Sequence, residues 1–212
     1  MGKFEYGGVT VELLGHASVR IKGDGKVIYI DPYVLDENPE KADIIFVTHE
    51  HFDHCATENI RKLVKSDTTV VATEDCLSKL ADLNLKTVVP NQEFEVNGVK
   101  VETVPAYNLG KPFHTPRSNW VGYVITVNGV RIYHAGDTDF IPEMRELRDI
   151  DIALLPIGGT FTMNEEEAAK ATNVIRPKVV IPMHYNYLRE TRADPIKFKN
   201  LVEEGIEVEI IL

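Results

Sequence analysis

Short hydrophobic runs, alternating with polar positions or bounded by glycine, dominate the first third of the chain. Such runs are typical of β-strands. They predict strands over Val9–Leu14, Ser18–Lys22, Lys26–Ile30, Asp43–Thr48 and Thr69–Ala72. Apolar residues at helical spacing predict two helices, over 57–65 and Glu74–Leu83, and Thr57 is the expected N-cap of the first.

Two β-hairpins are predicted in the middle of the chain. Each consists of two apolar runs joined by Asn-Gly, which supplies the positive φ angles of a type I′ turn. The hairpins are Glu93–Val96 with Val99–Val104, and Val121–Val127 with Val130–His134. Between them lies the irregular segment Tyr107–Asn119, and a connection this long inside a compact domain is more often functional than accidental.

The last third alternates strands with helices. Apolar runs predict strands over Asp151–Ile157, Lys178–Met183 and Ile206–Leu212, and helices are expected over Asn164–Ile175 and near Pro195–Glu203. Thr162 followed by Glu165 has the spacing of a capping box for the first of these helices. The whole order favours an α/β (α+β) fold in a single domain, residues 1–212. Two β-plus-α halves, roughly 1–105 and 106–212, would build a four-layer αββα sandwich.

Composition limits the classes of partner and compartment. The net charge of −10 argues against nucleic acid as a partner, because cationic contacts to phosphate dominate that affinity. Two cysteines do not make a disulfide framework. The first residues lack the apolar stretch of a signal peptide, and no window reaches the length of a membrane span. We therefore expect a cytoplasmic protein that does not use a membrane, whose oligomeric state the sequence leaves open.

The most informative segment is His49-Glu50-His51-Phe52-Asp53-His54, which follows the apolar run Asp43–Thr48. Imidazole and carboxylate are ordinary ligands of zinc and similar divalent ions. In an extended segment positions two apart point the same way, so His49 and His51 can share one ion. Asp53 and His54 can then face a second ion as the chain turns toward a helix. The segment stands at the carboxyl end of a strand, where open α/β sheets usually bind ligands.

Two further ligand candidates stand late in the chain. Asp137 lies in the turn Gly136-Asp137-Thr138, and a carboxylate there can bridge two cations and offset their repulsion. Gly136 allows a close backbone approach at this turn. His184 ends the apolar run that contains Val179 and Met183, a good place for a ligand.

These motifs together resemble the metallo-β-lactamase superfamily. The resemblance rests on the cluster at 49–54, the turn at Asp137 and the late His184. Within the superfamily the chain is similar to an uncharacterised metal-dependent hydrolase branch near the ascorbate-6-phosphate lactonases and the N-acyl-phosphatidylethanolamine phospholipases D. Leu14-Gly15-His16-Ala17-Ser18, Ile30-Asp31-Pro32 and Pro182-Met183-His184-Tyr185-Asn186 also match that branch.

The resemblance implies an αββα sandwich with an active site along one edge of its two sheets. It also implies a first metal held by His49, His51 and a third histidine, and a second metal held by Asp53, His54 and His184, with Asp137 as the bridge. In many relatives the third histidine follows a Pro-Ala-like run, but here Val104-Pro105-Ala106 continues with Tyr107-Asn108. His114 is the favoured replacement, and Asn108, a water or a single tightly held metal are the alternatives.

Other candidates are expected to stand outside the ligand set. His16, Asp31 and His134 are predicted to orient ligands or to be structural. Cys55, next to His54, is expected to be a small buried residue rather than a ligand.

The predicted activity is metal-dependent hydrolysis of a phosphodiester, lactone or related ester. Two divalent ions, zinc first and manganese or iron as alternatives, would hold a water as hydroxide. Asp53 would orient that water and accept its proton. Lys111 and Arg117 are candidates for binding a phosphate on a small anionic substrate. The alternative is a non-hydrolytic iron redox or metal-sensing protein with the same ligands.

Overall fold

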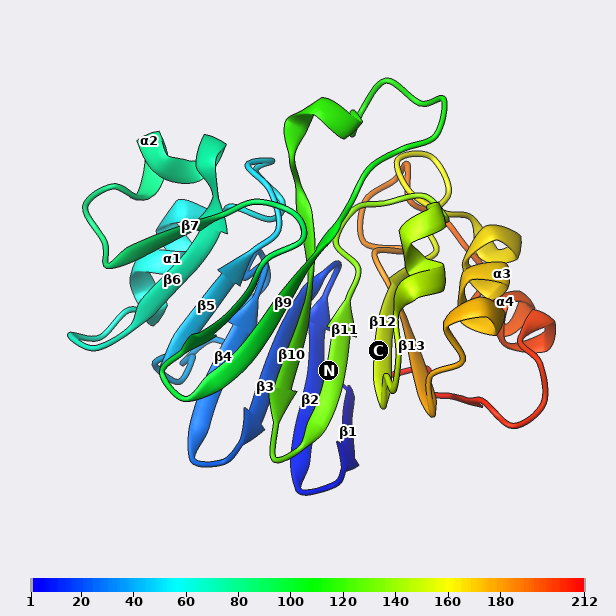
Figure 1. The fold of residues 1–212 in the computed structure, drawn as a ribbon, viewed down its shortest axis with the longest axis horizontal. Helices are drawn as coiled ribbons and strands as arrows, with labels where there is room; N and C mark the ends of the chain where they lie inside the picture. Colours follow the sequence, from blue (N-terminus) through cyan, green and yellow to red (C-terminus); the bar gives the residue numbers. More distant parts are fainter. Residues whose placement is uncertain (1, 212) are drawn as a thin grey trace.

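Two seven-stranded sheets form the centre of the molecule (Figure 1). The structure is a computed structural model, and it describes residues 2–211. The first sheet has the strand order β1-β2-β3-β4-β5-β6-β7. Its strands are β1 (Gly2–Tyr6), β2 (Val9–Gly15), β3 (Ser18–Gly23), β4 (Lys26–Ile30), β5 (Ile44–Val47), β6 (Thr69–Thr73) and β7 (Leu85–Val88).

The second sheet has the order β14-β13-β12-β11-β10-β9-β8. Its strands are β8 (Glu93–Val96), β9 (Val99–Pro105), β10 (Val121–Val127), β11 (Val130–His134), β12 (Ile152–Pro156), β13 (Val179–Met183) and β14 (Glu207–Val208). In both sheets the first four strands pair antiparallel and the later ones join in parallel. The two sheets therefore share one pattern of pairing.

Helices cover the outer face of each sheet and complete a four-layer αββα sandwich. On the first sheet lie α1 (Thr57–Leu63), η1 (Glu74–Cys76) and α2 (Leu77–Leu80), and on the second lie η3 (Pro142–Glu146), α3 (Glu165–Ile175) and α4 (Pro195–Leu201) (Figure 1). A separate hydrophobic cluster fills each of the three interfaces. Between the sheets, the rings of Phe46 and Tyr123 pack with centroids 4.8 Å apart. The predicted fold class is confirmed.

Several predicted boundaries need correction. The split between the halves lies at 89–92 rather than near 105, because β8 and β9 belong to the second sheet. The sequence patterns also missed β1 and β7, whose residues are mostly half-buried or exposed and so show little apolar contrast. The helix predicted over Glu74–Leu83 is a short 3₁₀ turn followed by α2. The last strand is only two residues long, and Leu212 lies outside the described residues.

Both predicted helix caps were wrong by one or two residues. Thr57 is the first helical residue of α1, whose N-cap Ala56 makes no side-chain hydrogen bond. In α3 the capping box is formed by Asn164 and Glu167, two residues after the predicted Thr162–Glu165 pair. Asn164 Oδ1 accepts the Glu167 N–H at 2.9 Å, and the Asn164 N–H donates to Glu167 Oε2 at 3.0 Å. Thr162 is instead fully buried in the preceding loop.

Both Asn-Gly hairpins form as predicted. Asn97 and Gly98 have φ angles of 46° and 82°, and Asn128 and Gly129 have 53° and 76°. The segment between the hairpins rises above the sheets as a long loop, with one 3₁₀ turn, η2 (Pro116–Ser118) (Figure 1, top). Within residues 2–211, every helix is too short or too polar to cross a bilayer.

Candidate metal centre

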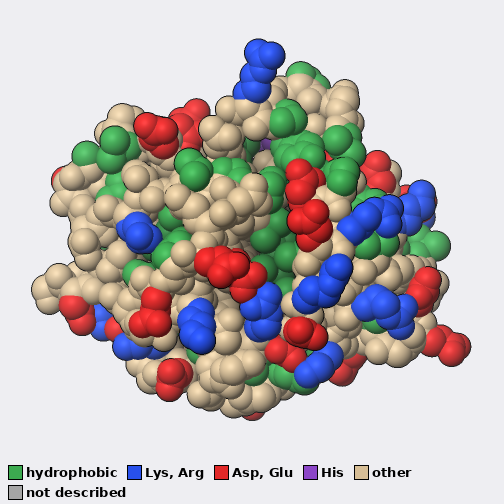
Figure 2. Space-filling view, viewed as in Figure 1, with side chains coloured by type: hydrophobic (Ala, Val, Ile, Leu, Met, Phe, Trp, Pro, Cys, Tyr) green, Lys and Arg blue, Asp and Glu red, His purple; other side chains and the backbone are tan. Residues whose placement is uncertain are grey.

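The ligand candidates meet where strands of both sheets end. Thr48 and His49 follow β5 of the first sheet, Asp137 follows β11 of the second, and His184 follows β13. The sheets touch at this edge, because Thr48 O accepts the Val121 N–H at 3.2 Å and Val47 O accepts the Tyr123 hydroxyl at 2.8 Å. Gly136 makes the contact possible: its φ is 64°, and a Cβ there would lie 3.0 Å from Val121 O. On the face that Figure 2 shows, little histidine colour reaches the surface, in keeping with the burial of the centre.

His49, His51 and His114 form one group of donors whose ligand atoms all lie within 4.8 Å of one another. His49 Nε2 and His51 Nδ1 are 3.0 Å apart, as expected for two positions on one side of an extended segment. His114 arrives from the long loop and completes the group. The structure thus places His114, rather than Asn108, beside the first pair.

His16, Asp53, His54 and His184 form a second group, also within 4.8 Å and fully or nearly buried. Asp53 Oδ2 lies 3.8 Å from His54 Nε2 and accepts a hydrogen bond from His16 Nε2 at 3.0 Å. The His16 and His184 rings are in contact, with centroids 3.9 Å apart and planes tilted by 39°, and the His184 N–H donates to His16 O at 2.8 Å. His16 therefore orients Asp53 through this hydrogen bond, which is one of the two roles that the sequence predicted for His16.

Asp137 stands between the two groups. Its Oδ1 lies 3.3 Å from His54 Nε2, and its Oδ2 lies 3.3 Å from His114 Nε2 and 3.2 Å from His184 Nε2. Two donors on one tetrahedral ion, each bonded at about 2.1 Å, stand roughly 3.4 Å apart. The spacings around Asp137 therefore fit a carboxylate that bridges two ions.

Buried polar atoms that lack a hydrogen-bond partner also indicate a metal site. Among residues 2–211, eight buried side-chain nitrogen or oxygen atoms have no hydrogen-bond partner, and six of them belong to this cluster. The six are His16 Nδ1, His54 Nε2, His114 Nε2, Asp137 Oδ1, His184 Nδ1 and His184 Nε2. Leaving buried polar atoms unpaired costs about 1–3 kcal/mol each, so such a concentration indicates a missing partner. Divalent cations fit this donor set.

Asp31 and Thr48 hold the histidines of the cluster in the correct tautomer. Asp31 Oδ2 accepts from His54 Nδ1 and from the Thr48 hydroxyl, both at 2.7 Å. Thr48 Oγ1 accepts in turn from His49 Nδ1 at 2.9 Å. Because Nδ1 carries the proton in both rings, Nε2 of each presents a lone pair to the centre. Asp31 was predicted as an orienting residue, but Thr48 was missed.

Asn108 has the same role for His114. Its Oδ1 accepts from the His114 N–H at 3.1 Å and from His114 Nδ1 at 2.9 Å, which directs Nε2 to Asp137. Its amide donates to Asp139 Oδ1 at 3.0 Å and to Phe161 O at 2.9 Å. Asn108 is thus a positioning residue in this geometry. Asp139, two residues after Asp137, was missed because its role depends on a loop that the sequence does not specify.

Burial and neighbouring charges set the protonation of the cluster. Burial would raise the pKa of Asp137, but His184, His54 and His114 lower that pKa well below its ordinary value. Burial would lower the pKa of His54, but Asp137 and Asp31 outweigh it and raise that pKa well above 6.5. Burial lowers the pKa of His49 and, less strongly, of His51. When no metal is bound, His54 therefore carries a second proton, on Nε2, near neutral pH. His49 and His51 are neutral donors.

The predicted phosphate clamp is not formed. Lys111 Nζ lies 2.6 Å from Asp139 Oδ1 and 2.6 Å from Thr162 O, so its ammonium anchors the loop. Arg117 is exposed and lines a different depression, with Glu74 and Asp75. The sequence placed both cations on the correct loop but could not specify their direction.

His134 and Cys55 lie outside the two groups of donors. His134 Nε2 donates to Ala17 O at 3.0 Å and its Nδ1 accepts the Gly136 N–H at 3.2 Å, so it supports the turn before Asp137. Cys55 is buried and, like Cys76, is a free thiol. The apolar wall of the first group is Trp120, whose ring centroid lies 4.6 Å from that of His49 and 4.7 Å from that of His51.

A cavity of about 400 Å³ leads to this centre. Its lining includes His51, Asp53, His114 and Asp137 of the cluster, together with the apolar residues Phe52, Phe113, Phe161 and Leu188, and Glu190. A volume of this size is within the usual range for small-molecule sites.

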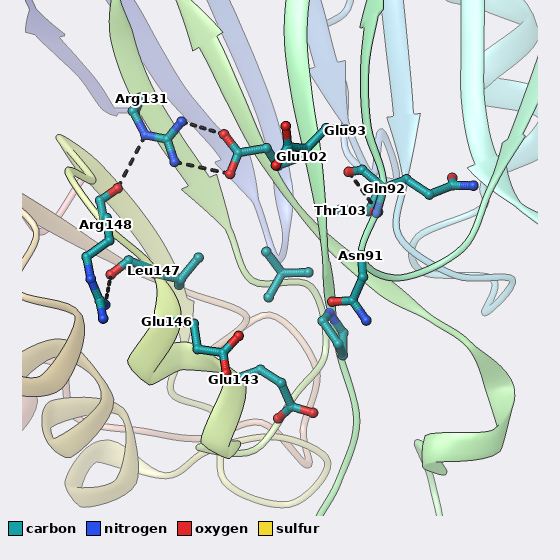
Figure 3. Close-up of a pocket in the computed structure, with 12 residues that line it drawn as sticks. Asn91, Gln92, Glu93, Glu102, Thr103, Arg131, Glu143, Glu146, Leu147 and Arg148 are labelled. Carbon is teal, nitrogen blue, oxygen red and sulfur yellow. Dashed lines mark hydrogen bonds and ion pairs between the residues drawn. The ribbon is translucent and has the colours of Figure 1, made fainter.

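A second cavity, of about 390 Å³, lies on the outer face of the second sheet beside η3 (Figure 3). Its charged residues are carboxylates such as Glu93, Glu143 and Glu146, and two arginines; Arg131 is paired with Glu102 (Figure 3). Its lining has no histidine or cysteine. This cavity therefore offers none of the imidazole donors that the histidine cluster brings together.

The fold and this site define a metallo-β-lactamase-type protein. A family model described as a beta-lactamase superfamily domain matches residues 10–184, which include every ligand candidate from His49 to His184.

Closer relatives identify the branch. The chain is 40% identical to a UPF0173 metal-dependent hydrolase of Thermococcus onnurineus and 38% identical to one of Thermococcus kodakarensis, and each alignment covers 96% of both chains. The protein belongs to this family of metal-dependent hydrolases, within the metallo-β-lactamase superfamily.

Solved structures agree with this placement. A proposed metal-dependent hydrolase of Parabacteroides distasonis superposes with a TM-score of 0.86 at 35% identity, covering 100% of this chain and 98% of that one. Igni18, a metallo hydrolase of Ignicoccus hospitalis, superposes with a TM-score of 0.79 at 29% identity, covering 95% and 94%.

Proposed function

We propose that this protein hydrolyses an ester bond, in a carboxylic ester, a lactone or a phosphodiester, with two divalent ions. The observation that carries the proposal is the group of unpartnered buried atoms on the proposed ligands, His54 Nε2, His114 Nε2, Asp137 Oδ1 and His184 Nε2. His49, His51 and His114 would hold one ion, Asp53, His54 and His184 the other, and Asp137 would bridge them. Zinc suits a set so rich in imidazole, and manganese or iron are the alternatives to test.

The ions supply Lewis acidity, which activates water and stabilises developing negative charge on the substrate. The chain supplies position and proton transfer. Asp53 lines the cavity, and although burial would raise its pKa, the hydrogen bond from His16 lowers it, so the carboxylate is ionised. In the proposed reaction Asp53 takes a proton from the attacking water and returns it to the leaving oxygen, while a bond from the water oxygen replaces the ester bond.

Two further features of the proposal concern setting. The substrate is a small molecule, because the centre lies at the end of a cavity of about 400 Å³. We also propose the cytoplasm as the compartment, because both cysteines are free thiols.

The test begins with metal analysis of the purified protein. The metal-free protein is then reloaded with zinc, manganese or iron and assayed on a panel of esters, lactones and phosphodiesters. We expect turnover that chelation abolishes, and a loss of more than about 100-fold in Asp137→Asn, since even residues that only orient ligands are worth 10–100-fold. Iron that changes absorbance on reduction, without hydrolysis by any metal form, would favour the redox alternative and overturn this proposal.

A further inference from the structure

The cavity that leads to the metal centre is mostly apolar away from its ligands. Phe52, Phe113, Phe161 and Leu188 line it, and no lysine or arginine does. Phe113 and Phe161 come from two different loops and meet edge to face, with centroids 4.9 Å apart and ring planes at 82°. This is a preferred geometry for an aromatic pair, so the two rings hold each other in place.

Two of these phenylalanine rings are largely exposed to solvent. Phe52 is 68% exposed and Phe113 is 42% exposed, and both line the cavity. The ring of Phe52 also contacts that of Tyr33, with centroids 5.8 Å apart. Exposed apolar side chains that cluster at the opening of a cavity indicate a binding site, whereas single scattered ones are ordinary on a protein surface.

Charge excludes an anionic substituent from this part of the cavity. Glu190, itself exposed, lines the cavity and would repel a carboxylate or phosphate placed beside the rings. Lys111 cannot compensate, because its ammonium is bound to Asp139 and Thr162 O. Positive charge is thus confined to the metal centre, where the reacting group lies.

We infer that the substrate carries an uncharged apolar group next to its scissile ester bond, and that Phe52, Phe113, Phe161 and Leu188 bind this group. The inference rests on the proposed function and names its substrate class. A cavity of about 150 Å³ already admits a benzene ring. The cavity here, of about 400 Å³, therefore has room for an ester with one aromatic ring or a short alkyl chain.

The kinetic test uses two esters that differ by one charge. p-Nitrophenyl butyrate and mono-p-nitrophenyl succinate share a leaving group and an acyl length, but only the succinate carries a carboxylate. With the metal-loaded enzyme we expect kcat/KM to be at least about tenfold higher for the butyrate than for the succinate. The succinate places a charge among apolar groups and near Glu190. An equal or higher value for the succinate overturns the inference.

Variants then assign the effect to the cavity. Phe113→Ala and Phe161→Ala should each lower kcat/KM for the butyrate about tenfold, mainly through KM, and change the succinate little. Glu190→Gln should raise kcat/KM for the succinate alone. Leu109→Ala is the matched control, because Leu109 is an exposed apolar residue on the same loop as Phe113 and does not line the cavity. A similar loss in the control would contradict the assignment.

A binding measurement separates this inference from the proposed hydrolysis. Acetophenone, which has no ester bond, should bind the metal-loaded protein more tightly than 4-acetylbenzoate, and Phe113→Ala should weaken acetophenone binding and so reduce the difference. If acetophenone binds more tightly but no ester is hydrolysed, the proposed hydrolysis is contradicted while the apolar binding site remains supported. If the phenylalanine variants instead change the oligomeric state in sedimentation without changing ligand binding, the rings form an interface between copies and the inference fails.

Discussion

A neutral histidine donates to a metal from one ring nitrogen, and a hydrogen bond that fixes the proton on the other nitrogen orients the ring for this role. In this chain the acceptors are a carboxylate for His54, a hydroxyl for His49 and an amide oxygen for His114. The ligand residues themselves are readable from sequence because they are dense and of the right type. The acceptors Thr48 and Asn108 are not, since each is an ordinary polar residue until the fold gives it a neighbour.

Asn108 provides a direct test of this orienting role. Asn108→Ala removes the nearer acceptor of His114 Nδ1, at 2.9 Å, and leaves only Phe161 O at 3.1 Å, so we expect the affinity for the first metal to fall about 10-fold. Competition with a chromophoric chelator measures the affinity. Asn59→Ala, at an amide that bonds Tyr33 O away from the cluster, is the control and should bind metal normally. Unchanged affinity in Asn108→Ala would mean that His114 needs no such support.

His16 provides a second test on the other side of the cluster. His16 has a φ of 55°, and asparagine tolerates this left-handed conformation, so His16→Asn removes the imidazole with little backbone strain. We expect the second metal to bind about 10–100-fold more weakly while the first is unaffected, because only Asp53 loses its donor. Titration calorimetry would show this as two separated binding steps. A single unchanged step would limit His16 to a packing role.

At the scale of elements, local pattern predicted most strands and both hairpins because each is encoded within a few residues. The weak edge strands β1 and β7 escaped because their side chains are partly exposed on both faces. The cluster at 49–54 was predictable for the same local reason, whereas the direction of the loop that carries Lys111 and His114 depends on contacts with Asp139 and Phe161, far along the chain. That is why His114 was one option among several, and why the pairing of Lys111 with Asp139 could not be foreseen.

The correction to the helix caps can be measured. Asn164→Ala removes the side-chain acceptor of the capping box of α3, and we expect it to lower the free energy of unfolding by about 1 kcal/mol. Thr57→Ala should change it by less than about 0.5 kcal/mol, because Thr57 makes no cap. Denaturant titration of the two variants gives both values. An equal cost for the two would contradict the assigned caps.

At the scale of the whole molecule, metal binding and folding are linked. The donors converge only in the fold, so we expect zinc to bind the folded chain far better than the unfolded one, and a free concentration 1,000 times the dissociation constant should add up to about 4 kcal/mol of stability. Thermal unfolding with zinc and after chelation measures this gain. Trp120, the only tryptophan, packs against His49 and His51, so its fluorescence should report metal binding directly. Equal Tm values with and without zinc would mean that the cluster holds no ion.

Binding should also release a proton. The pKa of His54 is raised well above 6.5 in the metal-free fold, so its charged form contributes stability that is present below 6.5 and lost as pH rises through the raised pKa. Below that raised pKa an incoming ion must displace the proton, so release should approach one proton per protein from this group and disappear at higher pH. Calorimetry in two buffers of different ionisation enthalpy counts it. At lower pH, protonation of His49 and His51, whose pKa values burial lowers below 6.5, should weaken binding further.

The backbone contact between His16 and His184 has a consequence for biosynthesis. These two residues stand at opposite ends of the chain, and the second cluster of donors is incomplete until both are present. A nascent polypeptide emerging from the ribosome exposes His49, His51, Asp53 and His54 long before Met183 and His184 are translated. With the ligands proposed above, the second ion can be fully coordinated only after residue 184 has been translated, and any early ion held by the histidine-rich turn alone would have to exchange or rearrange when the last ligand arrives.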